Sequence, residues 1–442
     1  MTTNPASMRA IVLDAPGPPE ALRISEIPIP TARPGEVLIK VEAFGLNRSE
    51  LHTRLGLADG VTFPRVLGIE ATGTVGACPG GEYEIGQQVA ALMGGMGRTF
   101  DGGYAEYTCV PVRQVVPFTS SLDWATLGAV PEMLQTSHGS LTVGLDAQPG
   151  QSLLIRGGTS SIGMATTVLA KRRGMTVVST TRNPERADIL EVIGVDHVLV
   201  DDGDVATRTR EIFPDGVDAA LELVGTPTLP DTLRATRVHG VVCFTGMLSN
   251  EWTVRDFYPI EYLPRGVRLT AYGGDASDLP ADVLQDFLDA VTAGDASVPI
   301  HRTYRLEDIA EAHADMEAGR AAGKLVVVPG HRPRCAPLHR ATGVRFERES
   351  QRARARLGQV TPLLAAGTDQ QVRGPSSASD HVRTRGGALG GQLAVRALGG
   401  ALNMVPEKES RGHAESEYLV GGHQHGGAHL IALRREAEQP LG

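Results

Sequence analysis

The sequence predicts an α/β protein that consists of a β-barrel followed by a doubly wound parallel sheet, and three observations lead to this fold class. Short alternating apolar and polar runs, separated by Gly and Pro, fill the first third of the chain. Strand-like and helix-like segments alternate after Pro149. Between them, residues 151–174 have the pattern of a strand, a glycine turn and a helix. A chain of 442 residues is long enough for about two to three domains.

The barrel prediction follows from the segments in chain order. Residues 8–13 (MRAIVL) are typical of a strand, and residues 37–42 (VLIKVE) alternate apolar and polar side chains. More short strands with Gly and Pro between them are expected over 63–89 and 102–117. Helical material begins near Leu122.

The glycine turn carries the first functional signal. An apolar run ends at Ile155, and the turn then reads G-x-S-x-x-G through Gly158, Ser160 and Gly163, with Ser in place of the usual middle Gly. A small side chain at each position lets the backbone approach a pyrophosphate, which the N–H groups at the start of the following helix bind. The turn predicts a dinucleotide site, although such glycines also serve as plain turn residues.

The next strand indicates which dinucleotide is bound. Residues 175–180 (MTVVST) predict a strand that ends at Thr180, Thr181 and Arg182. A site for NAD usually has an acidic residue here for the ribose 2′-hydroxyl, whereas a guanidinium pairs with a 2′-phosphate. The strand end therefore favours NADP, with a solvated surface charge as the alternative for Arg182.

Composition excludes several other classes of protein. No run is long enough to span a bilayer and the first residues do not form a leader sequence, so we expect no membrane partner and a cytoplasmic location. The four cysteines are scattered, which predicts reduced thiols rather than a disulfide framework. A net charge of −9 argues against a nucleic-acid partner.

The last part of the chain differs in kind from the rest. Residues 331–442 carry roughly +6, against roughly −15 for the first 330, and are rich in Arg, Gly, Ala, Ser and His. They show little periodicity beyond one short candidate helix at 347–357. We expect a low-complexity, disordered extension, with a basic nucleic-acid-binding arm as the alternative.

Several segments together, over about residues 8–330, resemble the medium-chain dehydrogenase/reductase superfamily, and most of all its zinc-independent NADPH:quinone oxidoreductase-like branch. The resemblance lies in PGEVLIKVEAFGLNRSELHTRLG (34–56), PRVLGIEATGTV (64–75), GGYAEY (102–107), LGAVPEMLQTSHGSL (127–141), GGTSSIG (157–163) and AGKLVVVPG (322–330). It implies a GroES-like domain over 8–128, completed by 266–330, a Rossmann domain over 129–265, a cofactor cleft between them, and a homodimer.

The same resemblance argues against a metal. Zinc-dependent relatives resemble the same segments, but they have a Cys at the position of Asn47 and a His at the position of Ile69. Their third ligand position aligns with Glu132. Catalytic zinc needs three protein ligands, and Ile69 has no lone pair. We expect no metal site.

Three residues are candidates for catalysis, each by position in the family. Asn47 is placed beside the nicotinamide, His52 stands where several relatives have Tyr, and Thr136 matches a threonine that faces the nicotinamide ribose. An amide can donate a hydrogen bond to the reduced acceptor, and a His can donate a proton near neutral pH. Each also has a structural alternative. Asn47 could form an Asx turn, His52 could be a surface histidine, and the hydroxyl of Thr136 could bond back to its own helix. Gln135 and Glu132 are weaker candidates for the same cleft.

The expected cofactor contacts lie at the turn, at the carboxyl ends of the strands and in the closing segment. The resemblance adds Lys324 as a phosphate contact, with an ordinary solvated lysine as the alternative, while Asp201 stands where NADPH-using relatives often have Tyr. The full set is Gly158, Thr159, Ser160, Ser161, Ile162, Gly163, Thr180, Thr181, Arg182, Arg186, Val224, Gly225, Phe244, Gly246 and Lys324.

The predicted function is hydride transfer from NADPH to a quinone or enone without zinc. The aromatic residues of 247–272 either stack on a flat acceptor or pack a domain junction. Two alternatives remain, an enoyl-thioester or other double-bond reductase and a non-catalytic NADPH-binding redox sensor; a zinc alcohol dehydrogenase ranks third.

Overall fold

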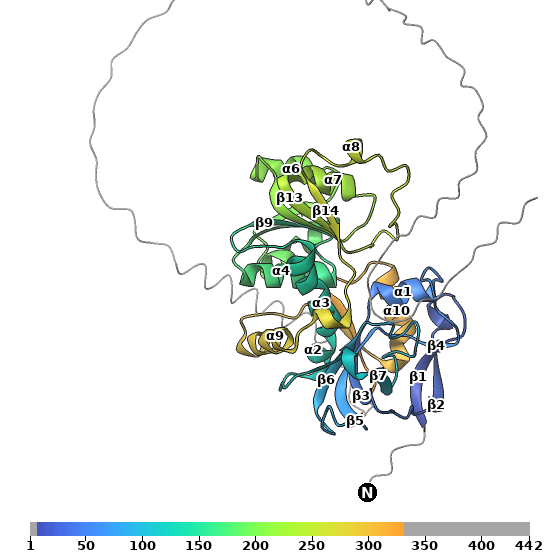
Figure 1. Ribbon diagram of the computed structural model, residues 1–442. Coiled ribbons are helices and arrows are strands. Elements are labelled where there is room, and N and C mark those ends of the chain that lie inside the picture. The colour runs from blue at the N-terminus through green and yellow to red at the C-terminus, as the bar shows by residue number, and fades with distance from the viewer. Residues whose placement is uncertain (1–6, 331–442) are drawn as a thin grey trace, which may run out of the picture. The chain divides into compact units, whose positions relative to one another are not determined.

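The computed structural model describes residues 7–330 of the chain. The predicted extension over 331–442, including the candidate helix at 347–357, lies outside the described residues. Within 7–330 the chain forms an α/β protein with a largely antiparallel β region and a parallel sheet between helices (Figure 1). The predicted fold class is confirmed.

The parallel sheet has six strands in the order β11-β10-β9-β12-β13-β14. The chain runs outward from β9 to β10 and β11, and then returns to the other side of β9 with β12. This reversal is the switch point at which α/β sheets bind ligands. The strands are β9 (Ser152–Arg156), β10 (Thr176–Thr181), β11 (His197–Val200), β12 (Val217–Glu222), β13 (Thr236–Phe244) and β14 (Arg268–Ala271).

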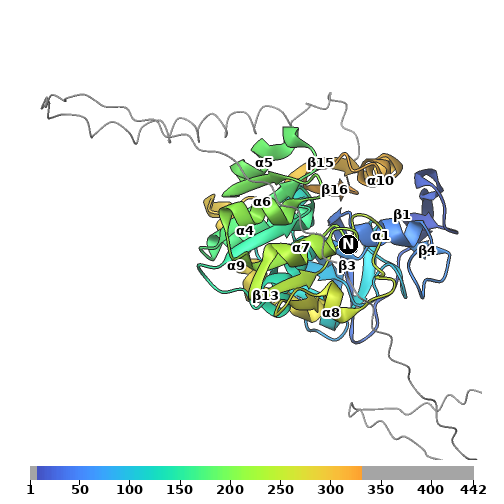
Figure 2. The same ribbon diagram turned by 90° about the horizontal axis from the view of Figure 1, so that it is seen from above.

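Helices cover both faces of this sheet, because successive residues of a buried strand point to opposite sides. Leu153 and Ile155 of β9 pack with Met164 on one face, whereas Leu154 packs with Leu233 on the other. Figure 2 shows α4, α6 and α7 around the strands. The helices of this region are α3 (Pro131–Gly139), the π-helix η3 (Ser140–Gly144), α4 (Ser161–Arg172), η4 (Pro184–Arg186), α5 (Ala187–Val192), α6 (Val205–Ile212), α7 (Leu229–Ala235) and α8 (Pro259–Tyr262).

The β region contains a three-stranded sheet, β2-β1-β4, and a seven-stranded sheet in the order β15-β16-β3-β5-β6-β8 with β7 paired to β3. Its elements are β1 (Ser7–Leu13), η1 (Pro19–Ala21), β2 (Arg23–Pro28), β3 (Glu36–Gly45), α1 (Arg48–Arg54), β4 (Arg65–Val66), β5 (Glu70–Ala77), β6 (Gln88–Leu92), β7 (Tyr107–Pro111), η2 (Val112–Gln114), β8 (Val115–Pro117), α2 (Trp124–Ala129), β15 (Ile300–Arg305) and β16 (Lys324–Val328).

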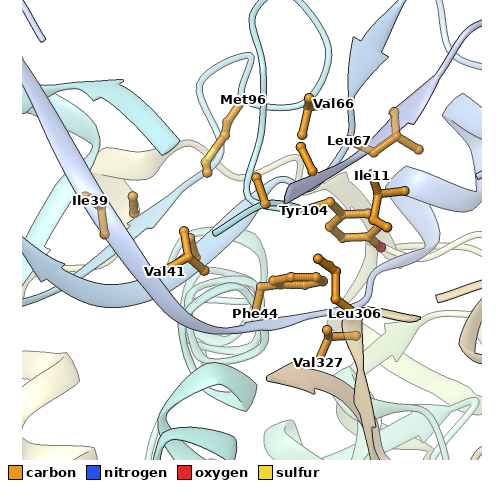
Figure 3. Close-up of a cluster of buried hydrophobic side chains, with 14 of the residues drawn as sticks. Ile11, Ile39, Val41, Phe44, Val66, Leu67, Met96, Tyr104, Leu306 and Val327 are labelled. Carbon is orange, nitrogen blue, oxygen red and sulfur yellow. The ribbon is translucent and has the colours of Figure 1, made fainter. Parts of the chain in front are cut away.

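The core of the β region is closed by residues from both ends of the described chain. Phe44 and Tyr104 stack with their ring centroids 4.6 Å apart, and Ile11, Leu306 and Val327 lie around them (Figure 3). A strand and a helix from the C-terminal segment are therefore needed to bury the apolar face of β3.

The chain returns to the β region after the parallel sheet. The returning elements are η5 (Ala276–Asp278), α9 (Ala281–Ala293), η6 (Leu306–Asp308) and α10 (Ile309–Glu317), followed by β16, which pairs antiparallel with β3. Strand β14, at 268–271, instead pairs with β13, so the parallel sheet extends beyond the predicted boundary at residue 265. The other domain boundaries stay predictions.

Within residues 7–330, none of the helices combines the length and the apolar character needed to cross a bilayer.

Candidate active site

The glycine turn has the backbone geometry that the sequence predicts. Gly157 has a φ of +88°, and a Cβ on Gly158 would lie 1.9 Å from Ser179 Oγ. A Cβ on Gly163 would lie 2.7 Å from the carbonyl oxygen of Gly157. Because these contacts exclude a side chain at 158 and 163, the turn packs closely against β10 and against the start of helix α4.

Ser160 caps helix α4, which explains why a serine replaces the middle glycine of the motif. Its Oγ accepts a hydrogen bond from the N–H of Gly163 at 3.1 Å and donates one to the carbonyl oxygen of Gly157 at 2.8 Å. The first N–H groups of a helix have no partner inside the helix, and those of Ser161 and Ile162 belong to this class. Both residues line a cavity that the two regions of the chain share.

This cavity has a volume of about 550 Å³ and is bordered by the β region and by the parallel-sheet region. It brings together seven of the predicted site residues: Asn47, His52, Thr136, Ser160, Ser161, Ile162 and Gly246. The remaining wall consists of Arg48, Ser49, Ile69, Met93, Gly94, Gly95, Met96, Arg98, Glu132, Leu223, Thr245, Met247, Leu248, Tyr272, Gly273, Gly274 and Asp275.

The other predicted cofactor residues border the turn rather than this cavity. The hydroxyl of Thr180 accepts a hydrogen bond from Gly157 N–H, and the carbonyl oxygen of Thr159 accepts one from Gly323 N–H. Thr181 is buried at the end of β10, whereas Arg182 is exposed. The turn and the strand end therefore adjoin, as a dinucleotide site requires.

Arg186 is held by the backbone of another segment. Its guanidinium donates to the carbonyl oxygens of Gly319, Arg320 and Ala321, at 3.2, 2.9 and 3.3 Å. These three bonds leave the hydrogen of Nε and one hydrogen of Nη1 without a partner among the described residues, so the phosphate contact of Arg186 stays a prediction.

The ends of β12 and β13 differ in their exposure to the cavity. The N–H groups of Val224 and Gly225 donate to Glu222 Oε1 at 2.7 and 3.1 Å, so a buried carboxylate fixes this loop. Phe244 packs against an apolar cluster of the parallel sheet, whereas Gly246 faces the cavity.

Asp201 forms an ion pair with buried Arg156, at 2.5 Å from Oδ2 to Nε. Asp231 pairs with the same guanidinium at 2.7 Å. The negative charge of Asp201 is thereby compensated, so it counts less against a phosphate than the sequence suggests.

A buried cation lies behind the cavity wall. Lys324 Nζ is fully buried, and it lies 2.9 Å from Glu70 Oε1, 3.1 Å from Glu132 Oε2 and 2.5 Å from Asn47 Oδ1. We call these four residues the lysine cluster. Burial by itself lowers the pKa of Lys324, but the carboxylates of Glu70 and Glu132 together outweigh it and hold this pKa above its usual value.

The lysine cluster corrects two sequence-based roles. The structure gives no support to a phosphate contact of Lys324, because its ammonium is 0% exposed and committed to two carboxylates. Asn47 is also fully engaged, since Nδ2 donates to Glu70 Oε1 at 3.0 Å and to Glu50 Oε1 at 3.3 Å. Its amide is therefore a structural donor here and leaves no hydrogen for a bound acceptor.

Burial dominates the protonation of the neighbouring carboxyl groups. Glu50 is fully buried, and burial raises its pKa to about 7 despite hydrogen bonds from the N–H groups of Ile69 and Asn47. Burial likewise raises the pKa of Glu70, which the ammonium of Lys324 partly offsets. Thr136 Oγ1 lies 3.1 Å from Glu132 Oε1 and connects the cluster to the cavity.

His52 lies in the cavity wall and is only 7% exposed. Its Nε2 is 3.1 Å from Asn250 Oδ1, and its ring lies 5.3 Å from that of Trp252. Burial lowers its pKa, and the charges of Arg48 and Arg98 lower it further, against the opposing effect of Asn250. His52 is therefore a neutral hydrogen-bonding group at pH 7.

Sequence reasoning missed three residues of this site. Arg48 and Arg98 both line the cavity, and Glu50 anchors Asn47. The spacing of Asn47 and Glu50 is that of a capping box, which could have revealed Glu50. The glycine-rich run 93–98 (MGGMGR) is a loop signal that could have directed attention to Arg98.

No group of three or more His, Cys, Asp or Glu side chains suited to a metal ion occurs in the part of the chain that the structure describes. The positions aligned with the zinc ligands of relatives hold an amide, an alkyl chain and a carboxylate, at Asn47, Ile69 and Glu132.

Comparison with known proteins agrees with this geometry. Residues 33–120 match the alcohol dehydrogenase GroES-like domain, and residues 193–327 match the family described as zinc-binding dehydrogenase. The quinone oxidoreductase of Lama guanicoe is 26% identical over 338 residues, which cover 74% of this chain and 99% of that protein. A 2-haloacrylate reductase of a Burkholderia species is 25% identical over 339 residues, covering 72% of this chain and 98% of that protein.

A solved structure extends the comparison to the cofactor. A mycobacterial protein in complex with NADPH superimposes with a TM-score of 0.65 at 26% identity, covering 73% of this chain and all of that one. The family to which this mycobacterial protein belongs binds pyridine nucleotides. From the matched domains and these relatives, the chain belongs to the medium-chain dehydrogenase/reductase superfamily, as an oxidoreductase of its quinone-oxidoreductase-like branch.

Proposed function

We propose that this oxidoreductase transfers hydride from NADPH to a quinone or another conjugated carbonyl acceptor without zinc. The observation that carries the proposal is the lysine cluster. Asn47 and Glu132, which align with two zinc-ligand positions of relatives, hold the ammonium of Lys324. The ammonium of Lys324 thus lies among these oxygens, and it would repel a Zn²⁺ ion bound at the same place.

Residues around the turn fit a dinucleotide. A Cβ at Gly158 would meet β10 and one at Gly163 would meet the backbone of the turn, and the N–H groups of Ser161 and Ile162 lie at the positive end of α4. When bound, NADPH would supply the hydride. The residues expected to hold it are those of 157–163 with Thr180 and Thr181.

Two arginines support NADPH over NADH. Arg48 lines the cavity, donates to the carbonyl oxygen of Leu248 at 2.9 Å and lies close enough to Arg182 for the two charges to repel. Arg182 is exposed at the end of β10. Because two guanidinium groups side by side favour an anion between them, we assign them to the phosphates of the cofactor.

The side chains of the wall suggest how the acceptor is reduced. The hydroxyl of Thr136 donates its single hydrogen to Glu132 Oε1 at 3.1 Å, so it donates to an acceptor oxygen only when it turns away from this carboxylate. Neutral His52 has one ring N–H, and it can offer this hydrogen to the acceptor only when Nε2 does not donate to Asn250 Oδ1. Leu223, Met93 and Met96 exclude water from the space between these groups.

We also propose that the chain forms a homodimer through the outer edge of β14. This strand ends the parallel sheet, and the nearby side chains of Phe257, Tyr258 and Ile260 are 46%, 54% and 81% exposed. A pairing of two edge strands would bury both features. Analytical ultracentrifugation of the full chain is expected to give twice the mass of one chain. A mass of one chain at every protein concentration would refute the dimer.

The function is tested by the loss of nicotinamide absorbance with NADPH or NADH and a panel of quinones, enones and aldehydes. We expect acceptor-dependent oxidation of NADPH by quinones or enones, little oxidation of NADH, and no effect of a zinc chelator. Arg182→Gln should narrow the preference for NADPH, whereas the exposed Arg113→Gln should leave it unchanged. One tightly bound zinc per chain would contradict the proposal, and NADPH binding without turnover would favour a redox sensor.

A further inference from the structure

The charged groups of the cavity wall leave two cations without a counterion among the described residues. Glu132 is engaged by Lys324, and Asp275 is an exposed residue that caps η5. Arg48 and Arg98 also line the cavity, and neither forms an ion pair with any carboxylate of residues 7–330. The wall therefore presents positive charge that the described chain does not neutralise.

Arg98 is held from the β region. It lies in the loop between β6 and β7, and its Nη2 donates to Ser49 Oγ at 2.7 Å. Its Nε is buried and has no hydrogen-bond partner among the described residues. Desolvating a donor of a charged group without a partner is unfavourable, so an anion that enters the cavity would gain by pairing with this guanidinium.

The surroundings of His52 place both arginines at the same space. Burial is the largest cause of its lowered pKa, and the charges of Arg48 and Arg98 act in the same direction. Charges influence a histidine in this way only when they lie nearby. Two guanidinium groups thus face the imidazole inside one cavity.

The two arginines serve different halves of that cavity. Arg48 contacts Leu248, in the loop after β13, and lies near Arg182 at the predicted cofactor site. Arg98 comes from the loop of the β region that also supplies Met93 and Met96. An anion paired with Arg98 would therefore belong to the acceptor rather than to the cofactor.

We propose that the acceptor is a conjugated carbonyl compound that carries a carboxylate, and that Arg98 binds this carboxylate. The inference rests on the proposed function, because it names the class of acceptor for the same hydride transfer. The C–H bond of the nicotinamide breaks as its hydride forms a C–H bond at the β-carbon, the π electrons of the C=C bond move toward the carbonyl group, and a proton taken from solvent water completes the α-carbon. NADPH leaves as NADP⁺, and the acceptor is reduced by two electrons.

Chemistry supports a role for this charge beyond binding. A carboxylate near a conjugated double bond repels incoming hydride, and negative charge increases further as the transfer proceeds. A guanidinium in a site with little water offsets both effects through paired, charge-assisted hydrogen bonds. Lysine offers the charge without the planar pair of donors.

The test compares trans-4-oxo-2-pentenoate with its methyl ester, which differ in the carboxylate charge. The wild-type protein should reduce the acid with the higher kcat/KM. Arg98→Gln should lower kcat/KM for the acid by about tenfold to a hundredfold, mainly through KM, and change that for the ester by less than about twofold. Arg98→Lys should retain part of the preference, and Arg113→Gln, an exposed arginine of the β region, should retain all of it.

The outcomes separate this inference from the proposed function. If quinones are reduced but the acid is no better than the ester, or if Arg98→Gln affects both alike, the carboxylate site is refuted and the function stands. If no acceptor oxidises NADPH, the function fails, and calorimetric titration of the acid in the presence of NADP⁺ decides the site. Binding that Arg98→Gln removes and Arg113→Gln keeps would support it; equal binding to both variants would refute it.

Discussion

The glycine turn at 157–163 and the lysine cluster border the same cavity but are built in opposite ways. The turn consists of seven consecutive residues and works through backbone groups and the absence of side chains. The cluster joins side chains from four separate segments, and its longest contact spans 277 residues, from Asn47 to Lys324. One site is local in sequence, and the other exists only in the folded chain.

This difference determines how each site should fail. Substitutions in the turn introduce atoms where there is no room, and their effect is a steric one. Substitutions in the cluster leave a buried charge without its partner, which is more unfavourable and depends on pH. Stability measured against pH should therefore separate the two regions more clearly than activity does.

The largest effect is expected for Lys324→Met, which leaves Glu70 and Glu132 without the ammonium. Breaking a buried ion pair in this way costs about 3–5 kcal/mol of the free energy of unfolding. Urea denaturation measures it, with Lys40→Met as control, because Lys40 is a half-exposed lysine paired with Glu42.

The pH dependence of this loss has a defined sign. Burial already raises the pKa of Glu70, and removal of the ammonium raises it further. The folded variant then binds more protons than the unfolded chain, so its stability falls as the pH rises. The deficit of Lys324→Met should be smaller at pH 5 than at pH 8; a deficit independent of pH would mean that Glu70 stays charged in the folded variant, so that its pKa is not raised.

Glu50, which is hydrogen-bonded to Asn47 of the lysine cluster, offers a second test of that region. Its pKa is about 7 in the folded protein and 4.5 in the reference state. Because the folded-state pKa is the higher one, its contribution to stability is lost as the pH rises from about 4.5 to 7, by roughly 3 kcal/mol at most. In Glu50→Gln this part of the decline should disappear, and an unchanged slope would contradict the buried neutral carboxyl.

Gly158→Ala tests the turn. The new Cβ would lie 1.9 Å from Ser179 Oγ and 2.9 Å from the carbonyl oxygen of Thr180, so β9 or β10 must shift. We expect a loss of about 1–3 kcal/mol in stability, independent of pH, together with weaker NADPH binding in a fluorescence titration.

A double variant makes this steric explanation falsifiable. Ser179 Oγ is buried without a hydrogen-bond partner among the described residues, so Ser179→Ala alone should be nearly neutral. Combined with Gly158→Ala it should recover part of the stability. Strictly additive effects would show that the clash lies elsewhere.

The contrast also explains what could be predicted from the sequence. The parallel sheet, the turn and the capped helix follow from patterns within a few residues, because strand periodicity and glycine conformation are local properties. The resemblance added Asn47, His52 and Thr136, which the fold does bring into one cavity. These predictions required only the order of the motifs along the chain.

The failures concern side chains whose partners are distant in sequence. Lys324 was predicted as a phosphate contact or a solvated lysine, because its partner Glu70 lies in β5, far away along the chain. Arg98 was missed for the converse reason, since only the folded chain shows that a loop arginine faces the cavity. A charge near a motif does not reveal whether the fold has already neutralised it.

The smallest expected effect separates the two functions of Ser160. Its hydroxyl caps α4, while its small size allows the backbone to approach the cofactor. Ser160→Ala should lower the free energy of unfolding by about 1 kcal/mol, whereas Ser160→Gly, which restores the glycine of the common motif, should cost only a few tenths. Both variants should keep NADPH affinity within about twofold, because the N–H groups of α4 remain. If Ser160→Gly were as destabilising as Ser160→Ala, or if either lost NADPH binding, the hydroxyl would have a role beyond the cap, and the turn would depend on a side chain as the lysine cluster does.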